Sequence, residues 1–222
     1  LNSCKKCNLS GANLSRENLK RADMTESNLS YANLSYTDVS SSVLTGINLS
    51  KANLENANLS NANLSKADLS NAKLDKSNLK RAQLMDSKLD GASLVKANLS
   101  FAKLENASLK SSVLTKANLN YANLIRTNLS HANLNGANLK NATMTEANLI
   151  GTDLTGAALP RYMKGVNLTG ANLTNAILVN VDFSGADLTR ANLTGANLTG
   201  AKIDKATLCN TITPWGLDDS GC

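Results

Sequence analysis

The sequence predicts an all-β solenoid in which the chain turns a corner every five residues and four sides close each coil. An apolar residue, nearly always Leu, stands at every fifth position over residues 9–159 and again over 168–208. Of these 40 central positions, 35 are Leu, and the residue two places before the centre is Ala in 27 repeats and Ser or Thr in eight. The residue just before the centre is Asn or Asp in 27 repeats.

A period of five excludes the two common regular structures. An α-helix would rotate successive Leu residues by ~140°, so they would point all round the axis. In a plain strand, side chains alternate between faces, so successive Leu residues would face opposite ways. Frequent Asn, Ser and Thr also disfavour helix. Short extended sides remain, with the small residue and the Leu pointing inward and Asn or Asp bonding backbone groups at the corners.

The repeated A-N-L-S-x pattern, as in residues 52–54 and 132–134, resembles that of the pentapeptide repeat family over roughly residues 8–208. The resemblance implies a right-handed quadrilateral β-helix with four repeats per coil. Residues 9–208 would then form about ten coils of 20 residues. At the ~4.8 Å strand spacing, these coils would stack into a rod roughly 45–50 Å long.

One irregularity interrupts the period at residues 160–165. Leu159 and Leu168 are nine residues apart, where the pattern requires ten. One interpretation is a one-residue deletion absorbed at a corner, with Met163 filling the missing Leu position. The other is a small protruding knob, carrying Arg161 and Tyr162, that recognises a partner, because loops on rigid scaffolds often carry function.

Both ends of a solenoid need caps, because a terminal coil exposes apolar surface and unpaired backbone groups. We expect residues 1–8 to form an N-terminal cap containing a C-x-x-C motif and residues 209–222 to form a C-terminal cap. The C-terminal segment leaves the repeat pattern, and we expect Ile212, Trp215 and Leu217 to cover the last coil. The chain begins with Leu and has no signal-peptide core, so we expect a processed or trimmed product.

The four cysteines mark the two ends. A disulfide needs Cα atoms within ~7 Å, so bonds along the whole rod are excluded and any bonds would join Cys4 to Cys7 and Cys209 to Cys222. For the C-x-x-C motif, a structural disulfide, a redox motif and half a zinc site all remain open. A thioredoxin-like motif would need a βαβ context. A zinc site would need two further ligands, and His131 is far away.

The cysteines also indicate in which cellular compartment the protein functions. Two bracketing pairs with no cysteine left over favour an oxidising environment. More than a dozen N-x-S/T sequons would risk bulky glycans in a eukaryotic secretory pathway, which favours bacterial export or a plastid. The stretch from Cys4 to Leu14 and the cysteine-flanked tail resemble the ends of exported pentapeptide repeat proteins of cyanobacteria and chloroplasts. This resemblance implies the bacterial periplasm or the thylakoid lumen.

Residues 20 apart should lie on one face in successive coils. Lys76, Lys96 and Lys116 would then form a ladder with ~4.8 Å steps, which Asp75 and Glu55 on the neighbouring column could partly neutralise. This column is either a basic stripe for an acidic partner or membrane surface, or a solvated face that keeps the rod soluble. A second face collects further basic and aromatic residues: Lys20, Arg21, Lys80, Arg81, Lys140, Phe101 and Tyr121.

The sequence argues against an enzymatic function. It contains no P-loop, G-x-S-x-G or H-E-x-x-H motif, and a filled Leu core leaves no cavity for a small-molecule substrate or cofactor. His131 falls at an outward position, and no run of 18 apolar residues could span a membrane. We therefore expect a non-enzymatic protein with no metal or cofactor, either a monomer or an end-to-end dimer.

The favoured hypothesis is a rigid scaffold that mediates protein–protein interaction in an extracytoplasmic compartment, with a partner that the sequence does not name. The alternative, implied by the resemblance, is a DNA mimic that regulates a topoisomerase. The net charge of +6 opposes mimicry, since a duplex mimic must be negative. Nucleic-acid binding is disfavoured because no aromatic stacking platform is evident, and an ice-binding rod would need one regular Thr face.

Overall fold

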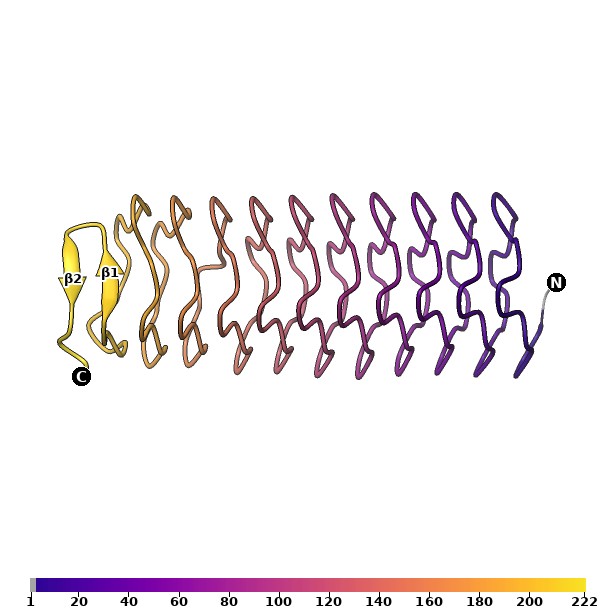
Figure 1. Cartoon of the computed structure of the whole chain (residues 1–222), viewed down its shortest axis with the longest axis horizontal. Coiled ribbons are helices and arrows are strands. Elements are labelled where there is room, and N and C mark those ends of the chain that lie inside the picture. The colour runs from indigo at the N-terminus through magenta and orange to yellow at the C-terminus, as the bar shows by residue number, and fades with distance from the viewer. Residues whose placement is uncertain (1–2) are drawn as a thin grey trace.

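The computed structural model describes residues 3–222 as a straight rod of stacked coils with the two termini at opposite ends (Figure 1). Residues 1 and 2, which belong to the expected N-terminal cap, lie outside the described part. Two short strands stand at the C-terminal end, β1 (Thr211–Thr213) and β2 (Gly216–Asp218). The remaining pairing consists of single parallel bridges, which begin with Ser3 and Asp23 and nearly all join residues 20 apart. The predicted coil of four five-residue sides is confirmed.

Almost every side ends in a tight β-turn. The carbonyl of the central residue accepts a hydrogen bond from the amide three residues later, as from Ala102 to Leu99 at 3.0 Å. The third residue of the turn has a positive φ, which is 60° at Phe101 and 57° at Lys116. An L-residue in this left-handed conformation costs roughly 1–2 kcal/mol. The corner positions that look freely variable in the sequence therefore share one strained backbone state.

Asn and Asp side chains brace these corners. The Asn98 side-chain oxygen accepts the amide of Ser100 at 3.1 Å, and Asn148 accepts that of Ile150 at 3.0 Å. Asp187 does the same for Thr189 at 2.9 Å. The corner bonding predicted for Asn and Asp is confirmed, and it explains why these residues precede the central Leu in most repeats.

The interior is a sealed column of Leu and Ala. The central Leu residues and the small residues before them are almost all buried from Leu19 to Leu193, and Phe183 fills one central position. Towards the N-terminal end, Leu9 and Leu14 are only partly buried against this core. Backbone hydrogen bonds between successive coils surround the core, so neighbouring coils supply most of each other's contacts.

The irregularity at residues 160–165 is a shortened corner. Only Pro160 and Arg161 separate Leu159 from the next bridging residue, Tyr162, and neither has a positive φ. Met163 is fully buried, and its amide donates to the carbonyl of Asp182 at 2.9 Å. The predicted one-residue deletion, with Met163 in the Leu position, is confirmed.

This shortened corner interrupts the hydrogen-bond ladder on one side of the rod. Bridges that cross it join residues 19 apart, such as Asn148 and Asn167, whereas Tyr162 again pairs with a residue 20 further on. The amides of Asn141, Met144 and Glu146, which in other coils would bond to the next coil, make no backbone hydrogen bond here. We call residues 158–165 and the coil contacts around them the break.

The C-terminal end corrects one expectation. The repeat continues beyond residue 208, because Ile212 bridges Asn192 and the buried Thr211 and Thr213 take the two inward positions of that repeat. Ile212 therefore falls at an outward position and is 46% exposed, and Trp215 and Leu217 are 62% and 66% exposed. The expectation that these three side chains cover the last coil is wrong.

The tail itself closes this end. Strands β1 and β2 form an antiparallel hairpin, and the chain then returns so that the amide of Gly221 donates to the carbonyl of Leu208 at 2.7 Å. A Cβ at Gly221 would lie 2.5 Å from the Leu208 nitrogen, so only Gly fits there. A Cys209–Cys222 disulfide, with Cα atoms 4.8 Å apart, holds the returning tail.

The other two cysteines are also joined. Cys4 and Cys7 form a disulfide with a Cα–Cα distance of 5.5 Å, and the described chain contains no free cysteine. Cys4 lies partly buried against the core, in the position of a central Leu. The bridging ladder already includes Ser3, so residues 3–8 form part of the first coil.

Candidate interaction surfaces

The interior is lined by apolar side chains and a few hydroxyls. Most of these hydroxyls donate to backbone carbonyls, as Thr127 does to Leu104 at 2.8 Å, whereas the buried Ser77 hydroxyl has no partner in the described part of the chain. Within residues 3–222, no group of three His, Cys, Asp or Glu side chains is arranged to hold a metal ion. No helix in this part of the chain is long and apolar enough to cross a membrane. Candidate sites therefore have to be sought on the outer surface.

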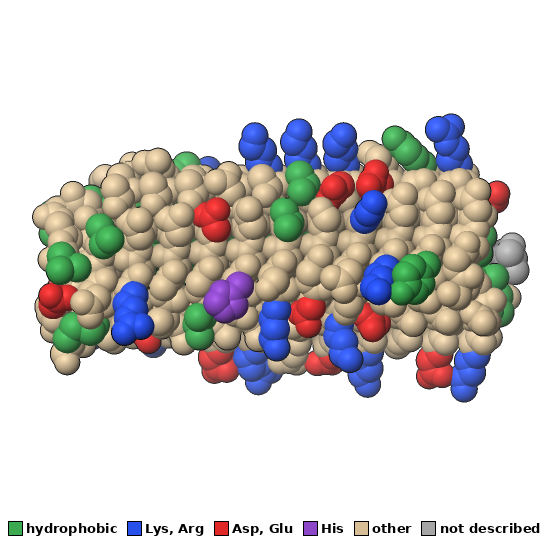
Figure 2. Space-filling view, viewed as in Figure 1, with side chains coloured by type: hydrophobic (Ala, Val, Ile, Leu, Met, Phe, Trp, Pro, Cys, Tyr) green, Lys and Arg blue, Asp and Glu red, His purple; other side chains and the backbone are tan. Residues whose placement is uncertain are grey.

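The structure places Lys76, Lys96 and Lys116 in three successive coils at one corner of the rod, and we call them the lysine column. Their amides donate to the carbonyls of Val95, Thr115 and Asn135, respectively, at 2.8–2.9 Å, which fixes the step from coil to coil. All three side chains are exposed. Figure 2 shows Lys and Arg side chains standing in a row along one edge of the rod.

The charge of the lysine column is not cancelled by ion pairs. The two ion pairs within residues 3–222 join Lys5 to Asp23 and Lys6 to Glu26, both near the N-terminal end. The carboxylate of Asp75, which was expected to neutralise the column in part, accepts the backbone amide of Val95 at 2.9 Å and forms no ion pair with the column. Glu55 makes no ion pair either. The column therefore presents three adjacent ammonium groups to solvent.

The second basic face contains an arrangement that sequence analysis did not predict. The rings of Phe101 and Tyr121 stack with centroids 5.0 Å apart and planes 7° from parallel, and the Arg81 guanidinium lies 5.7 Å from the Phe101 centroid. Similar contacts join Arg16 to Tyr36 at 5.4 Å and Lys51 to Tyr31 at 5.1 Å. In each pair the residues are 20 apart, so the 20-residue length of a coil could have been used to predict that they are neighbours.

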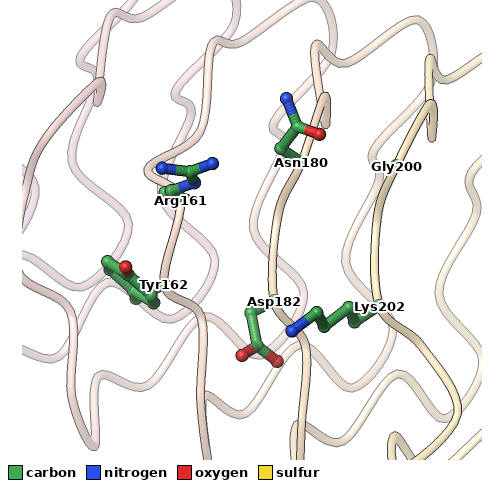
Figure 3. Close-up of a pocket in the computed structure, with 6 residues that line it drawn as sticks. All are labelled: Arg161, Tyr162, Asn180, Asp182, Gly200 and Lys202. Carbon is green, nitrogen blue, oxygen red and sulfur yellow. The ribbon is translucent and has the colours of Figure 1, made fainter.

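Arg161 and Tyr162 lie at the break, where two shallow hollows open on the outer surface. One, of about 360 Å³, is lined by Arg161, Tyr162, Asn180, Asp182, Gly200 and Lys202. Figure 3 shows these residues on three successive coils, with Lys202 directed towards Asp182. The second hollow, of about 390 Å³, shares Arg161 and Asn180 with the first and includes Ile177 and Val179. Sequence analysis singled out the break but did not predict these hollows.

Asp182 is the one carboxylate in the first hollow. The hydrogen bonds from the Ser184 hydroxyl and amide lower the pKa of Asp182 below its usual value, and the charges of Lys202 and Lys164 lower it further. Asp182 is therefore ionised at neutral pH. His131, in contrast, is an exposed corner residue beside Gly151.

Comparison with known proteins agrees with this architecture. A family model described as pentapeptide repeats matches in eight copies that extend over residues 7–159 and 167–212. No curated protein sequence is significantly similar to the chain. Among solved structures, HetL from the cyanobacterium Nostoc sp. strain PCC 7120, described as a pentapeptide repeat protein involved in heterocyst differentiation regulation, is 32% identical. The match covers 96% of this chain and 88% of HetL, with a TM-score of 0.54.

The plasmid-mediated fluoroquinolone resistance protein QnrB1 is similar in fold. It is 20% identical over 98% of this chain and 89% of its own, with a TM-score of 0.54. The fold is a right-handed quadrilateral β-helix, as in both proteins. Proteins built in this way are generally structural or interaction proteins without enzymatic activity, and they act through protein partners. From its repeats and its coils, the chain belongs to the pentapeptide repeat family.

Proposed function

We propose that this protein is a non-enzymatic rigid scaffold that binds an acidic surface of a protein partner through the lysine column. The observation that carries this proposal is the ladder of Lys76, Lys96 and Lys116 on successive coils, none of which forms an ion pair within residues 3–222. Ammonium groups repeated at ~4.8 Å present a concentrated positive edge, and such edges steer association with negatively charged partners. A rod with a sealed core holds this spacing because it has little freedom to bend.

The fold supports recognition by a preformed surface. Each lysine stands on a turn whose backbone is fixed by bonds to the next coil, so little backbone entropy is lost on binding. The side chains themselves remain mobile and hydrated, which suits binding that depends on salt concentration. The proposed partner is therefore an acidic protein surface held with moderate, salt-sensitive affinity.

A triple charge reversal tests the lysine column. We expect Lys76→Glu, Lys96→Glu and Lys116→Glu together to abolish recovery of the partner from the native compartment, as quantified by mass spectrometry. The matched control is Lys20→Glu, Lys80→Glu and Lys110→Glu, which changes the net charge equally but on three exposed residues that do not lie in successive coils of one column. Recovery of the same proteins by all three forms would refute the role of the column.

We also propose an oxidising, extracytoplasmic location such as the periplasm or thylakoid lumen. The disulfides at the two ends and the lack of a free cysteine in residues 3–222 support it. Alkylation of the protein in freshly lysed cells, before any reductant is added, should label none of the four cysteines. Complete labelling would contradict the proposed compartment but leave the scaffold function untouched.

A further inference from the structure

At the break, the outer surface of the rod departs from the regular repeat and two hollows open. The two hollows adjoin each other because Arg161 and Asn180 line both. Their shape follows from the shortened corner, since the chain passes from Leu159 to Tyr162 without the usual left-handed turn. At Gly200 there is no side chain, and a Cβ there would collide with the Asn180 side chain. The shape of the hollows therefore results from the shortened corner and from the glycine at position 200.

Apolar side chains are exposed around these hollows. Ile177 and Val179 are 48% and 41% exposed, and Tyr162 is 69% exposed. In the next coil, the positions equivalent to Ile177 and Val179 hold Asn197 and Thr199, the polar residues typical of the repeat. The fold does not require aliphatic residues at these outward positions. Their clustering beside a hollow suits contact with another apolar group.

The charge around the apolar side chains is positive. Lys140 lines one hollow, Lys202 lines the other, and Arg161 lines both, whereas Asp182 is the only carboxylate in either. None of these cations forms an ion pair in the part of the chain that the structure describes. A group that fills the second hollow would thus meet aliphatic carbon together with Lys140 and Arg161, while Lys202 lies beside Asp182 in the adjoining hollow.

We propose that the break is a docking site for an extended segment of a partner protein that carries carboxylates on either side of an aliphatic side chain. The aliphatic side chain packs on Ile177 and Val179, and the carboxylates pair with Arg161 and with Lys140 or Lys202. Arg is suited to hold a carboxylate through two parallel hydrogen bonds. Single-stranded nucleic acid would need several flat rings on which successive bases stack, and Tyr162 is the one aromatic residue that lines the two hollows.

This site is separate from the lysine column. The column lies at the neighbouring corner and nearer to the N-terminus, and no residue is common to both. Loss of binding at one surface therefore leaves the other intact, and the two proposals fail independently.

Selection from a displayed library of random peptides tests the site directly. The full chain is the target, and the counter-target is a variant in which residues 160–163 are replaced by the five-residue repeat Ser-Asn-Ala-Asn-Leu. This replacement restores the corner and removes both Arg161 and the hollows. We expect the enriched peptides to combine Asp or Glu with Leu, Ile or Val. Enrichment of basic peptides, or of none that distinguishes the two targets, would overturn the proposal.

Binding of an enriched peptide, followed by fluorescence anisotropy, assigns the contacts. Arg161→Glu should weaken binding at least about tenfold, and Ile177→Asn with Val179→Thr should do the same without altering charge. The latter pair introduces the residues of the next coil, so it keeps the fold, which circular dichroism verifies. The lysine-column reversal should leave binding within about twofold. An equal loss in that variant would show general attraction to a basic rod and would refute the docking site.

Discussion

At the scale of single residues, the corners decide much of the behaviour of this rod. Residues as different as Lys96, Phe101 and Ser111 occupy the same left-handed backbone state, with φ of 57°, 60° and 54°. Such a state is tolerated because coil-to-coil hydrogen bonds and the corner bonds of Asn and Asp fix it from both sides. The side chain at a corner therefore changes stability through its backbone preference as well as its contacts.

Ser111 offers a clean measurement of this corner strain, because it is exposed and has no side-chain partner. We expect Ser111→Val to destabilise the protein by about 1–2 kcal/mol, since a β-branched residue fits the left-handed region poorly. Ser111→Gly should be nearly neutral, because relief of strain offsets the greater freedom of the unfolded chain. Urea unfolding measures both variants, and equal midpoints for Val and Gly would contradict the strain argument.

A corner carboxylate makes stability depend on pH. Burial raises the pKa of Asp187, but hydrogen bonds from the Thr189 hydroxyl and amide and from Thr169 lower it by more, so the pKa lies below its ordinary value of 3.8. A depressed folded-state pKa contributes stability above the unfolded pKa, and this contribution is lost as the pH falls through the folded pKa.

Asp187→Asn isolates this titration, because Asn keeps the acceptor oxygen that most repeats use at the same position. The wild type should lose melting temperature more steeply than the variant as the pH is lowered from about 5 to about 2. Thermal unfolding monitored by circular dichroism provides the curves. Parallel curves through this range would exclude Asp187 as a contributor.

At this scale, the features that could be predicted from the sequence are those that follow directly from the five-residue period. The inward positions and the bonding role of Asn and Asp follow from their spacing, and both are confirmed. The stacking of Arg81, Phe101 and Tyr121 was missed because it depends on side-chain conformations and not on the repeat alone. The left-handed backbone conformation shared by the corners could not be predicted, because many different residue types occupy this position.

At the scale of structural elements, the break and the C-terminal tail differ from the regular coils. The position of Met163 could be predicted because it stands five residues before Leu168, in phase with the repeat that resumes there. The hollows could not, since they depend on which side of the coil loses its bonds and on the missing side chain at Gly200. At the tail, the apolar character of Ile212, Trp215 and Leu217 suggested wrongly that they cover the last coil. Continuing the five-residue period from Leu208 to Thr213 would have placed Ile212 at an outward position.

The broken ladder predicts a local loss of protection from hydrogen exchange. The amides of Asn141, Met144 and Glu146 lack the bonds to the next coil that equivalent amides make elsewhere, so they should exchange faster. Native-state exchange followed by mass spectrometry should show this against residues 121–126, one coil earlier. In the variant with the restored five-residue corner, the protection should return. Equal exchange in the two segments would contradict the interrupted ladder.

The tail disulfide should stabilise the C-terminal end. Cys209 and Cys222 are separated by 13 residues, and closing a loop of that size stabilises by about 3 kcal/mol in the chain-entropy model. Cys209→Ser with Cys222→Ser should therefore lower the urea midpoint and expose the amide of Gly221, which donates to the Leu208 carbonyl, to exchange. For Cys4→Ser with Cys7→Ser, which opens a much shorter loop, we expect about 2 kcal/mol. A larger loss from the N-terminal pair would contradict this ordering.

At the scale of the whole molecule, stability is close to a sum over neighbouring coils, because each coil packs only on those beside it. Leu99 in the middle of the rod is fully buried, whereas Leu9 near the end is only partly buried. We expect Leu99→Ala to cost about 2–5 kcal/mol and Leu9→Ala clearly less. Urea unfolding with exchange detection should show the Leu99 defect confined to adjacent coils. Loss of protection along the entire rod would indicate one cooperative unit.

The stacking of coils also determines how the molecule would respond to tension between its ends. A coil of twenty residues adds only ~4.8 Å to the rod, yet the same residues span about 66–72 Å when fully extended. Each coil peeled from an end would lengthen the chain by more than tenfold its height. The segments closed by the two disulfides cannot extend, so the additional length under tension comes from the coils between them.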